Sequence, residues 1–152
     1  MTVADCLKRL GLTLPAAPKP VGAYVPAVRT GKLIFTSGQL PVRDGRLTAA
    51  GKVPVDVPVP AAAEAARQAV LNALAVIDAH AGGLDNVARI VRLNVFVASA
   101  LGFADQAKVA NGASELLVEL FGDAGRHTRC AIGAAELPLN APVELDLIVE
   151  LK

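Results

Sequence analysis

The chain has 152 residues, the usual length of one domain, and its net charge is only +1. Proteins whose main ligand is DNA or RNA normally carry a strong basic surface, so this composition predicts no nucleic-acid partner. Charges interrupt every apolar stretch before it reaches the length of a membrane span, and the first residues do not resemble a secretory signal. A cytoplasmic protein without a membrane partner is therefore expected.

Hydrophobic residues make up 53% of the chain although aromatic residues make up only 3%. A single domain of this size is expected to leave part of that apolar surface exposed, and exposed apolar patches commonly mark interfaces. The composition therefore predicts an oligomer. The two cysteines, Cys6 and Cys130, lie far apart and are expected to be reduced thiols, as is usual inside the cell.

Residues 1–20 are expected to form an N-terminal helix and a proline-rich connector, ahead of a main domain over residues 21–152. One helical face gathers four apolar residues, Val3, Cys6, Leu7 and Leu10, and Gly11 ends the pattern. The segment 14–20 contains three prolines, which exclude both regular helix and regular strand.

The rest of the chain alternates between patterns typical of strands and of helices. Strands are predicted at 23–29, 32–37, around the Asp44-Gly45 hairpin turn, and at 87–97, 128–135 and 143–151, and helices at 61–79 and 104–121. The order β-β-β-α-β-α-β-β predicts an α+β fold in which both helices cover one face of a single mixed sheet. The other face would then pack against copies of the same chain in a closed ring.

Arg129 and Glu144 are the pair of residues with the clearest chemical potential. A guanidinium presents two parallel donors to a small carboxylate, and a nearby carboxyl can move protons. Spacing alone leaves two other interpretations open, a cross-strand salt bridge between these residues or two solvated side chains. Because the usual zinc, phosphate-loop and serine-hydrolase motifs are absent, neither a metal site nor covalent serine catalysis is expected.

Two signatures resemble those of the RidA/YjgF family, the reactive intermediate deaminases also named endoribonuclease L-PSP. The first runs from Gly22 to Val28 and from Gly31 to Pro41, and the second combines Arg129 with segments 136–138 and 143–146. The resemblance covers roughly residues 18–151 and leaves the N-terminal helix outside. It implies a chorismate-mutase-like homotrimer with sites between subunits. It also implies hydrolysis of enamine or imine intermediates such as 2-aminoacrylate to keto acid and ammonia, without a cofactor.

The resemblance also implies residue roles. Arg129 would hold the carboxylate of the substrate, and Glu144 would position a water or transfer a proton. Tyr24 would line the cleft from a neighbouring subunit, while Ser37 and the backbone of Gly38 would contact the substrate near its reacting carbon.

Several positions depart from the family pattern and suggest a divergent branch. His127 and Thr128 replace small residues before Arg129, and Ala131 stands where a cysteine is common. If Arg129 points into the cleft, Ala131 points there too and Cys130 points away. His127 would either line the cleft or be a loop histidine bonded to backbone or solvent. Ser114, three residues after Asn111, replaces an aromatic residue.

Two other functions remain open from the sequence. A non-catalytic module that senses a small carboxylate metabolite would need the same arginine. An endoribonuclease is a label attached to the family, but the near-zero charge, the few aromatic residues and the lack of an evident acid–base histidine pair argue against it.

Overall fold

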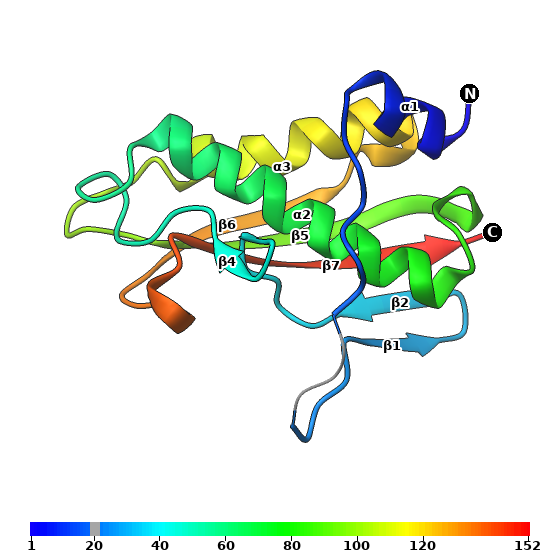
Figure 1. The fold of residues 1–152 in the computed structure, drawn as a ribbon, viewed down its shortest axis with the longest axis horizontal. Coiled ribbons are helices and arrows are strands. Elements are labelled where there is room, and N and C mark those ends of the chain that lie inside the picture. The colour runs from blue at the N-terminus through cyan, green and yellow to red at the C-terminus, as the bar shows by residue number, and fades with distance from the viewer. Residues whose placement is uncertain (19–21) are drawn as a thin grey trace.

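The computed structural model describes residues 1–18 and 22–152, in which a five-stranded sheet lies beneath two long helices (Figure 1). The spatial order of the strands is β1-β2-β7-β5-β6. Their bounds are β1 (Ala27–Thr30), β2 (Leu33–Thr36), β5 (Val87–Ala98), β6 (Thr128–Ala134) and β7 (Val143–Leu151). β5 and β6 run parallel and the other neighbours antiparallel, so the predicted α+β fold with a mixed sheet is confirmed.

The two long helices are α2 (Val59–Ala81) and α3 (Gln106–Phe121), each within two residues of its predicted bounds. α2 ends at Gly82, which adopts the left-handed conformation that glycine tolerates best. His80, in the last turn of α2, bonds through Nδ1 to the Val76 carbonyl at 2.8 Å. The helices approach closely at Gly112, where a Cβ atom would collide with the Ala63 carbonyl.

The sheet has one buried face and one open face. In β7, five apolar residues alternate beneath the helices, as predicted: Val143, Leu145, Leu147, Val149 and Leu151. The residues between them point to the opposite face, which we call the open face. Val28, Phe35 and Ile132 lie there with 55%, 39% and 50% of their surface exposed. Large apolar side chains are therefore exposed on the side that the helices do not cover.

The prediction that the third strand belongs to the main sheet is wrong. β3 (Val42–Arg43) and β4 (Arg46–Leu47) form a separate two-stranded hairpin, with the predicted turn at Asp44-Gly45. The buried amide of Asn72 on α2 donates to the carbonyls of Leu40 and Val42, both at 2.9 Å. These bonds draw the segment onto the helix and away from the sheet.

The order of the last strands also differs from the order along the chain. β5 lies between β6 and β7, so Arg129 and Glu144 are not on neighbouring strands. The alternative of a cross-strand salt bridge between them is therefore wrong. The first strand begins at Ala27 rather than at residue 23, directly after Pro26, and it lies at a sheet edge.

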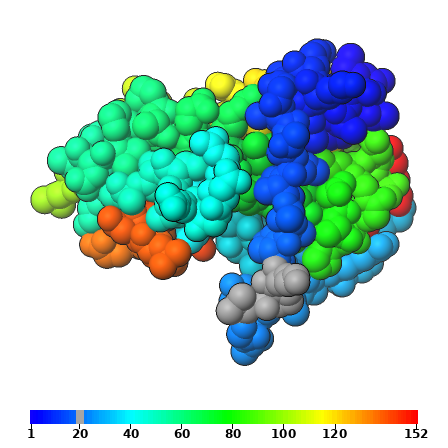
Figure 2. Space-filling view, viewed as in Figure 1, coloured from blue at the N-terminus to red at the C-terminus, as the bar shows by residue number. Residues whose placement is uncertain are grey.

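The N-terminal helix α1 (Val3–Arg9) is confirmed, with Val3, Cys6 and Leu7 buried in the same core as the long helices. Thr2 and Asp5 form a capping box, and hydrogen bonds from the backbone and side chain of Thr2 lower the pKa of Asp5. The connector then runs down the molecule to residue 18 without regular structure (Figure 2, blue). The expected domain boundary between residues 20 and 21 lies outside the described residues.

Short 3-10 turns complete the fold. They are η1 (Leu84–Asn86), η2 (Gly122–Gly125) and η3 (Pro138–Asn140). Cys6 is buried, Cys130 is exposed, and both are free thiols as expected. Within the described parts of the chain, no helix has both the length and the apolar character needed to cross a membrane.

Candidate functional site

One chain places the expected site residues in two groups on opposite faces of the sheet. Arg129 on β6 is level with Leu93 of β5, which is fully buried beneath the helices. Glu144 on β7 is level with Phe96 of β5, three residues further along. Because side chains alternate along a strand, positions three apart point to opposite faces. Arg129 therefore lies on the helix side and Glu144 on the open face.

The first group, which we call the Glu144 half, consists of Tyr24, Ser37, Gly38 and Glu144. The carboxylate of Glu144 packs directly against Gly38, where a Cβ atom would collide with Oε1 and lie 3.0 Å from Cδ. Backbone bonds in both directions between Gln39 and Leu145, at 2.7 and 3.1 Å, hold this loop beside β7. A side chain at position 38 would therefore displace the carboxylate of Glu144 from its present place.

The surroundings of Glu144 favour its protonated form. Partial burial raises the pKa of its carboxyl above the ordinary value, and the negative charge of nearby Asp146 raises it further. A glutamic acid in such surroundings retains its proton at a higher pH than a solvated one. It is therefore better suited to giving and taking a proton during a reaction.

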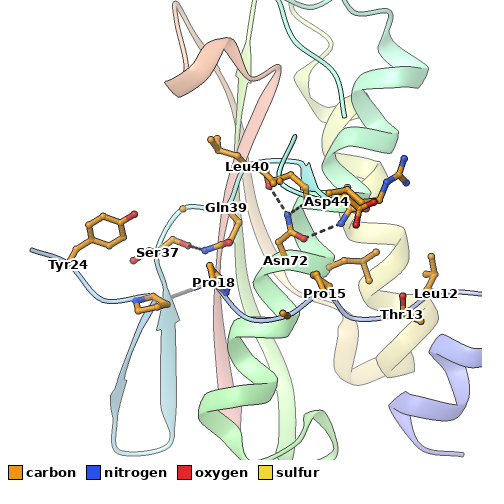
Figure 3. A pocket seen from close by; sticks show the side chains of 18 of the residues that line it. Leu12, Thr13, Pro15, Pro18, Tyr24, Ser37, Gln39, Leu40, Asp44 and Asn72 are labelled. Carbon is orange, nitrogen blue, oxygen red and sulfur yellow. Dashed lines mark hydrogen bonds between the residues drawn. The ribbon is translucent and has the colours of Figure 1, made fainter. Parts of the chain in front are cut away.

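Ser37 ties the loop to the segment that follows Tyr24. Its hydroxyl donates to the Val25 carbonyl at 2.6 Å, and its backbone N–H donates to the Pro26 carbonyl at 2.8 Å. The hydroxyl hydrogen of Ser37 is therefore already used in a bond to the backbone, while its oxygen can still accept a hydrogen bond from a ligand. Tyr24 is 63% exposed, with its ring at one end of a cleft (Figure 3).

This cleft has a volume of about 860 Å³ and lies between the connector and the body of the protein. Figure 3 shows Tyr24 and Ser37 towards one end, Leu12 and Thr13 towards the other, and Asn72 between them. The hairpin of β3 and β4 and one face of α2 complete the walls. The volume falls within the usual range for small-molecule sites, roughly 300–1,000 Å³, but neither Glu144 nor Arg129 is among the residues that line this cleft.

The second group, which we call the Arg129 half, contains Arg129, His127 and Ala131 from β6 and its approach. Arg129 Nη1 donates to Asn111 Oδ1 at 2.8 Å and to Ser114 Oγ at 3.1 Å, both on α3. The Ser114 hydroxyl also lies 2.9 Å from His127 Nε2, and His127 Nδ1 lies 2.6 Å from the Gly125 carbonyl. The guanidinium is thus held at the sheet edge by side chains of the adjacent helix.

The neighbours of Arg129 on β6 follow the expected alternation. Ala131 lies on the same face as Arg129 and packs against the edge of the core. Cys130 points to the open face, where Arg92 Nη2 donates to its sulfur at 3.1 Å. His127 makes the backbone bond that was the alternative to a cleft role, and it also bonds to Ser114. In residues 1–18 and 22–152, no three metal-binding side chains gather as a metal site.

Comparison with known proteins places this geometry in a family. The sequence model described as "YjgF/chorismate_mutase-like, putative endoribonuclease" matches residues 5–151. The chain belongs to this family. The match to the YjgF family begins within α1, whereas the signatures in the sequence were traced only from about residue 18.

Three relatives illustrate the range of similarity within the YjgF family. Protein TCP17 of Trypanosoma cruzi is 45% identical over 98% of this chain and 94% of its own length. The 2-iminobutanoate/2-iminopropanoate deaminase of Escherichia coli K12 is 34% identical over 87% of this chain and 90% of its own. The crystal structure of Atu1372 from Agrobacterium tumefaciens, described as of unknown function, has a TM-score of 0.93 and 44% identity, covering 99% of this chain and 92% of its own.

Two residues that contact Arg129 were not among the expected site residues of this YjgF-family chain. Asn111 and Ser114 lie three positions apart on α3, a spacing that places both side chains on one helical face. That spacing is visible in the sequence. The facing of α3 towards the start of β6 is not, because it depends on the parallel pairing of β6 with β5.

Proposed function

We propose that the chain is a hydrolase that converts reactive enamine or imine acids of the 2-aminoacrylate type to keto acids and ammonia. The observation that carries the proposal is the half-buried Glu144 carboxyl with its raised pKa, packed on Gly38 beside Ser37. Such a group can protonate carbon and then accept a proton from water. Arg129 supplies the charge that a substrate carboxylate requires, and a relative named as a deaminase supports the same reaction.

The proposed reaction balances with water as the only co-reactant. Protonated Glu144 gives its proton to C3 of the enamine, and the C2–N bond becomes an iminium double bond. Water then forms a bond to C2 and loses a proton to the Glu144 carboxylate, giving a carbinolamine. A proton moves from its hydroxyl to its nitrogen, the C–N bond breaks, and ammonia and the keto acid leave. Holding the carboxylate and the water in one site lowers the entropic cost of the attack.

We also propose that the working form is a homotrimer in the cytoplasm, with each site built from the Glu144 half of one subunit and the Arg129 half of a neighbour. The two halves lie on opposite faces of one sheet, so a substrate touching both needs a second copy. The exposed apolar residues of the open face support packing against such a copy. A closed ring satisfies every subunit in the same way.

The first test measures ammonia and pyruvate released from 2-aminoacrylate generated in situ. The wild-type protein is expected to exceed the spontaneous rate clearly. Arg129→Ala is expected to lower kcat/KM about 50-fold, because two hydrogen bonds to a charged carboxylate contribute roughly 2–3 kcal/mol. Wild-type protein that does not exceed the spontaneous rate contradicts the deaminase proposal. Pyruvate binding without turnover would then favour a sensing role, and cleavage of RNA by the same preparation would favour an endoribonuclease.

The second test asks whether one site draws on two chains. Arg129→Ala and Glu144→Gln proteins, each strongly impaired alone, are unfolded together and refolded as a mixture. A shared site predicts recovery of about one quarter of the wild-type activity, since in a randomly mixed ring that fraction of sites receives both intact residues. A mixture that stays as impaired as the single variants contradicts the shared site. Glu150→Gln, on the same face of the same strand, serves as the control for the refolding procedure.

A further inference from the structure

We propose that Ser114 and His127 are positioning residues that orient the guanidinium of Arg129 so that its Nε–Nη2 edge can receive a carboxylate. The inference rests on the proposed function, because it assumes that Arg129 binds the carboxylate of a substrate. It assigns a purpose to two residues that the reaction itself does not use.

The first step concerns the five N–H groups of Arg129. The two hydrogens of Nη1 have two acceptors, Asn111 Oδ1 at 2.8 Å and Ser114 Oγ at 3.1 Å. Among the residues that the structure describes, no hydrogen bond reaches Nε or Nη2. The N–H groups of Nε and Nη2 point the same way and match the two oxygens of a carboxylate. The helix therefore holds one end of the guanidinium and leaves the edge suited to a carboxylate.

The second step concerns the direction of the hydrogen bonds around His127. A carbonyl oxygen can only accept, so His127 Nδ1, 2.6 Å from the Gly125 carbonyl, carries the hydrogen. In the neutral ring Nε2 is then an acceptor, and the Ser114 hydroxyl at 2.9 Å donates to it. The oxygen lone pairs of Ser114 are left for Arg129. One directed chain thus runs from Arg129 through Ser114 and His127 to the backbone.

The third step explains why the chain of bonds is fixed in space. Gly125, in the turn before β6, is buried, and a Cβ atom there would collide with the Leu117 carbonyl and lie 2.9 Å from Val118 Cα. Glycine therefore lets this turn pack directly on α3. The carbonyl that receives His127 is set against the same helix that carries Ser114, so the orientation of Arg129 is tied to the packing of α3 on β6.

The test separates positioning from general stability by comparing a carboxylate ligand with its uncharged counterpart. The Kd of the assembled protein is measured by calorimetry for pyruvate and for pyruvamide, and KM and kcat are measured with 2-aminoacrylate. Ser114→Ala is expected to raise the Kd for pyruvate and the KM about tenfold, with kcat within about twofold. The Kd for pyruvamide should not change. Ser114→Thr keeps the hydroxyl and should restore the wild-type values.

Two substitutions of His127 distinguish the roles of its two ring nitrogens. His127→Gln places an amide oxygen near the position of Nε2 and should keep pyruvate binding within about threefold of wild type, since the acceptor for Ser114 remains. His127→Asn can still donate to the Gly125 carbonyl but offers Ser114 no acceptor, so it should behave like Ser114→Ala. Ser99→Ala is the matched control, because this half-buried hydroxyl bonds to Gln106 and the Val97 carbonyl instead.

The outcomes distinguish this inference from the function on which it rests. If wild-type protein neither hydrolyses 2-aminoacrylate nor binds pyruvate, the proposed function fails. If Arg129→Ala shows the expected loss of activity but Ser114→Ala binds pyruvate normally, only the positioning role is overturned. The same follows if Ser114→Ala weakens pyruvate and pyruvamide equally, or if His127→Asn matches wild type.

Discussion

Two features of the surroundings of Glu144 disfavour the charged form of its carboxyl. Partial burial removes water from it, and Asp146, two residues along the same face of β7, adds a like charge. Folding therefore favours the proton on Glu144, while the unfolded chain releases it at the ordinary value of 4.5. A group whose pKa is raised by folding contributes stability only at low pH. That contribution disappears as the pH rises through the raised pKa.

Glu144→Gln is therefore expected to unfold at a higher temperature than wild type at pH 7, since it removes a disfavoured charge. The difference should shrink as the pH falls and vanish below 4.5, where both states hold the proton. Melting temperatures of both proteins across this pH range provide the measurement. In an Asp146→Asn background the gap should be smaller but still present, because burial is the larger cause. A variant that is less stable than wild type at pH 7 would contradict this account.

At the scale of elements, Asn72 joins α2 to the segment that carries the cleft. It is the one buried polar side chain among the described residues, and its amide satisfies the carbonyls of Leu40 and Val42 while Gln68 donates to its oxygen at 3.1 Å. This segment follows directly from Ser37 and Gly38. One amide thus fixes the path of the loop that faces Glu144.

Asn72→Ala is expected to lower the free energy of unfolding by about 1–3 kcal/mol, since it removes both hydrogen bonds and leaves the Leu40 carbonyl with only the Val42 N–H at 2.8 Å. Urea unfolding at pH 7, where the midpoint and slope are both measured, checks the value. Gln68→Ala is the control, because it removes only the bond to the Asn72 oxygen and should cost less than about 1 kcal/mol. If Asn72→Ala changes stability no more than Gln68→Ala does, the segment is held by other contacts.

The elements that the sequence predicts well are those whose signals are local. Gly82 and Gly122 mark the ends of the long helices, and the alternation in 143–151 identifies the buried face of β7. The partners of each strand are set by contacts distant in sequence. The residues of β6 do not by themselves predict that this strand pairs with β5 rather than with β7. For that reason the sequence could single out Arg129 and Glu144 as candidates, while their separation onto opposite faces could not be predicted from it.

At the scale of the whole molecule, the many apolar residues of the chain lie in two kinds of place. Many of them are alanines buried within α2 and α3, including Ala66, Ala69 and Ala113, where small side chains let the helices approach. Three of the larger exposed residues, Phe35, Val28 and Ile132, lie on the open face, the first two on β2 and β1 and the third on β6. Only this second share supports the prediction of an oligomer.

Phe35→Asp is expected to dissociate the assembly, because a carboxylate on the open face would have to lose water at an apolar interface. Analytical ultracentrifugation should then give a mass close to the 15.6 kDa of one chain, with the helical circular dichroism retained. Leu101→Asp is the matched control, since Leu101 is a fully exposed apolar residue elsewhere and its replacement should leave the mass unchanged. Equal masses for wild type and Phe35→Asp would show that the open face is not the interface.

The close approach of α2 and α3 at Gly112 also affects the motion of the residues that hold Arg129. Alanine and glycine have no rotamers to lose, so a helix pair packed through Ala63 and Gly112 forms with little cost in side-chain entropy. It also has few alternative arrangements, because backbone touches backbone directly. Asn111, adjacent to Gly112, and Ser114, two residues beyond Gly112, therefore project from the stretch of α3 that packs directly against α2. The residues that hold Arg129 thus extend from a helix whose position is set by direct backbone contact with its neighbour.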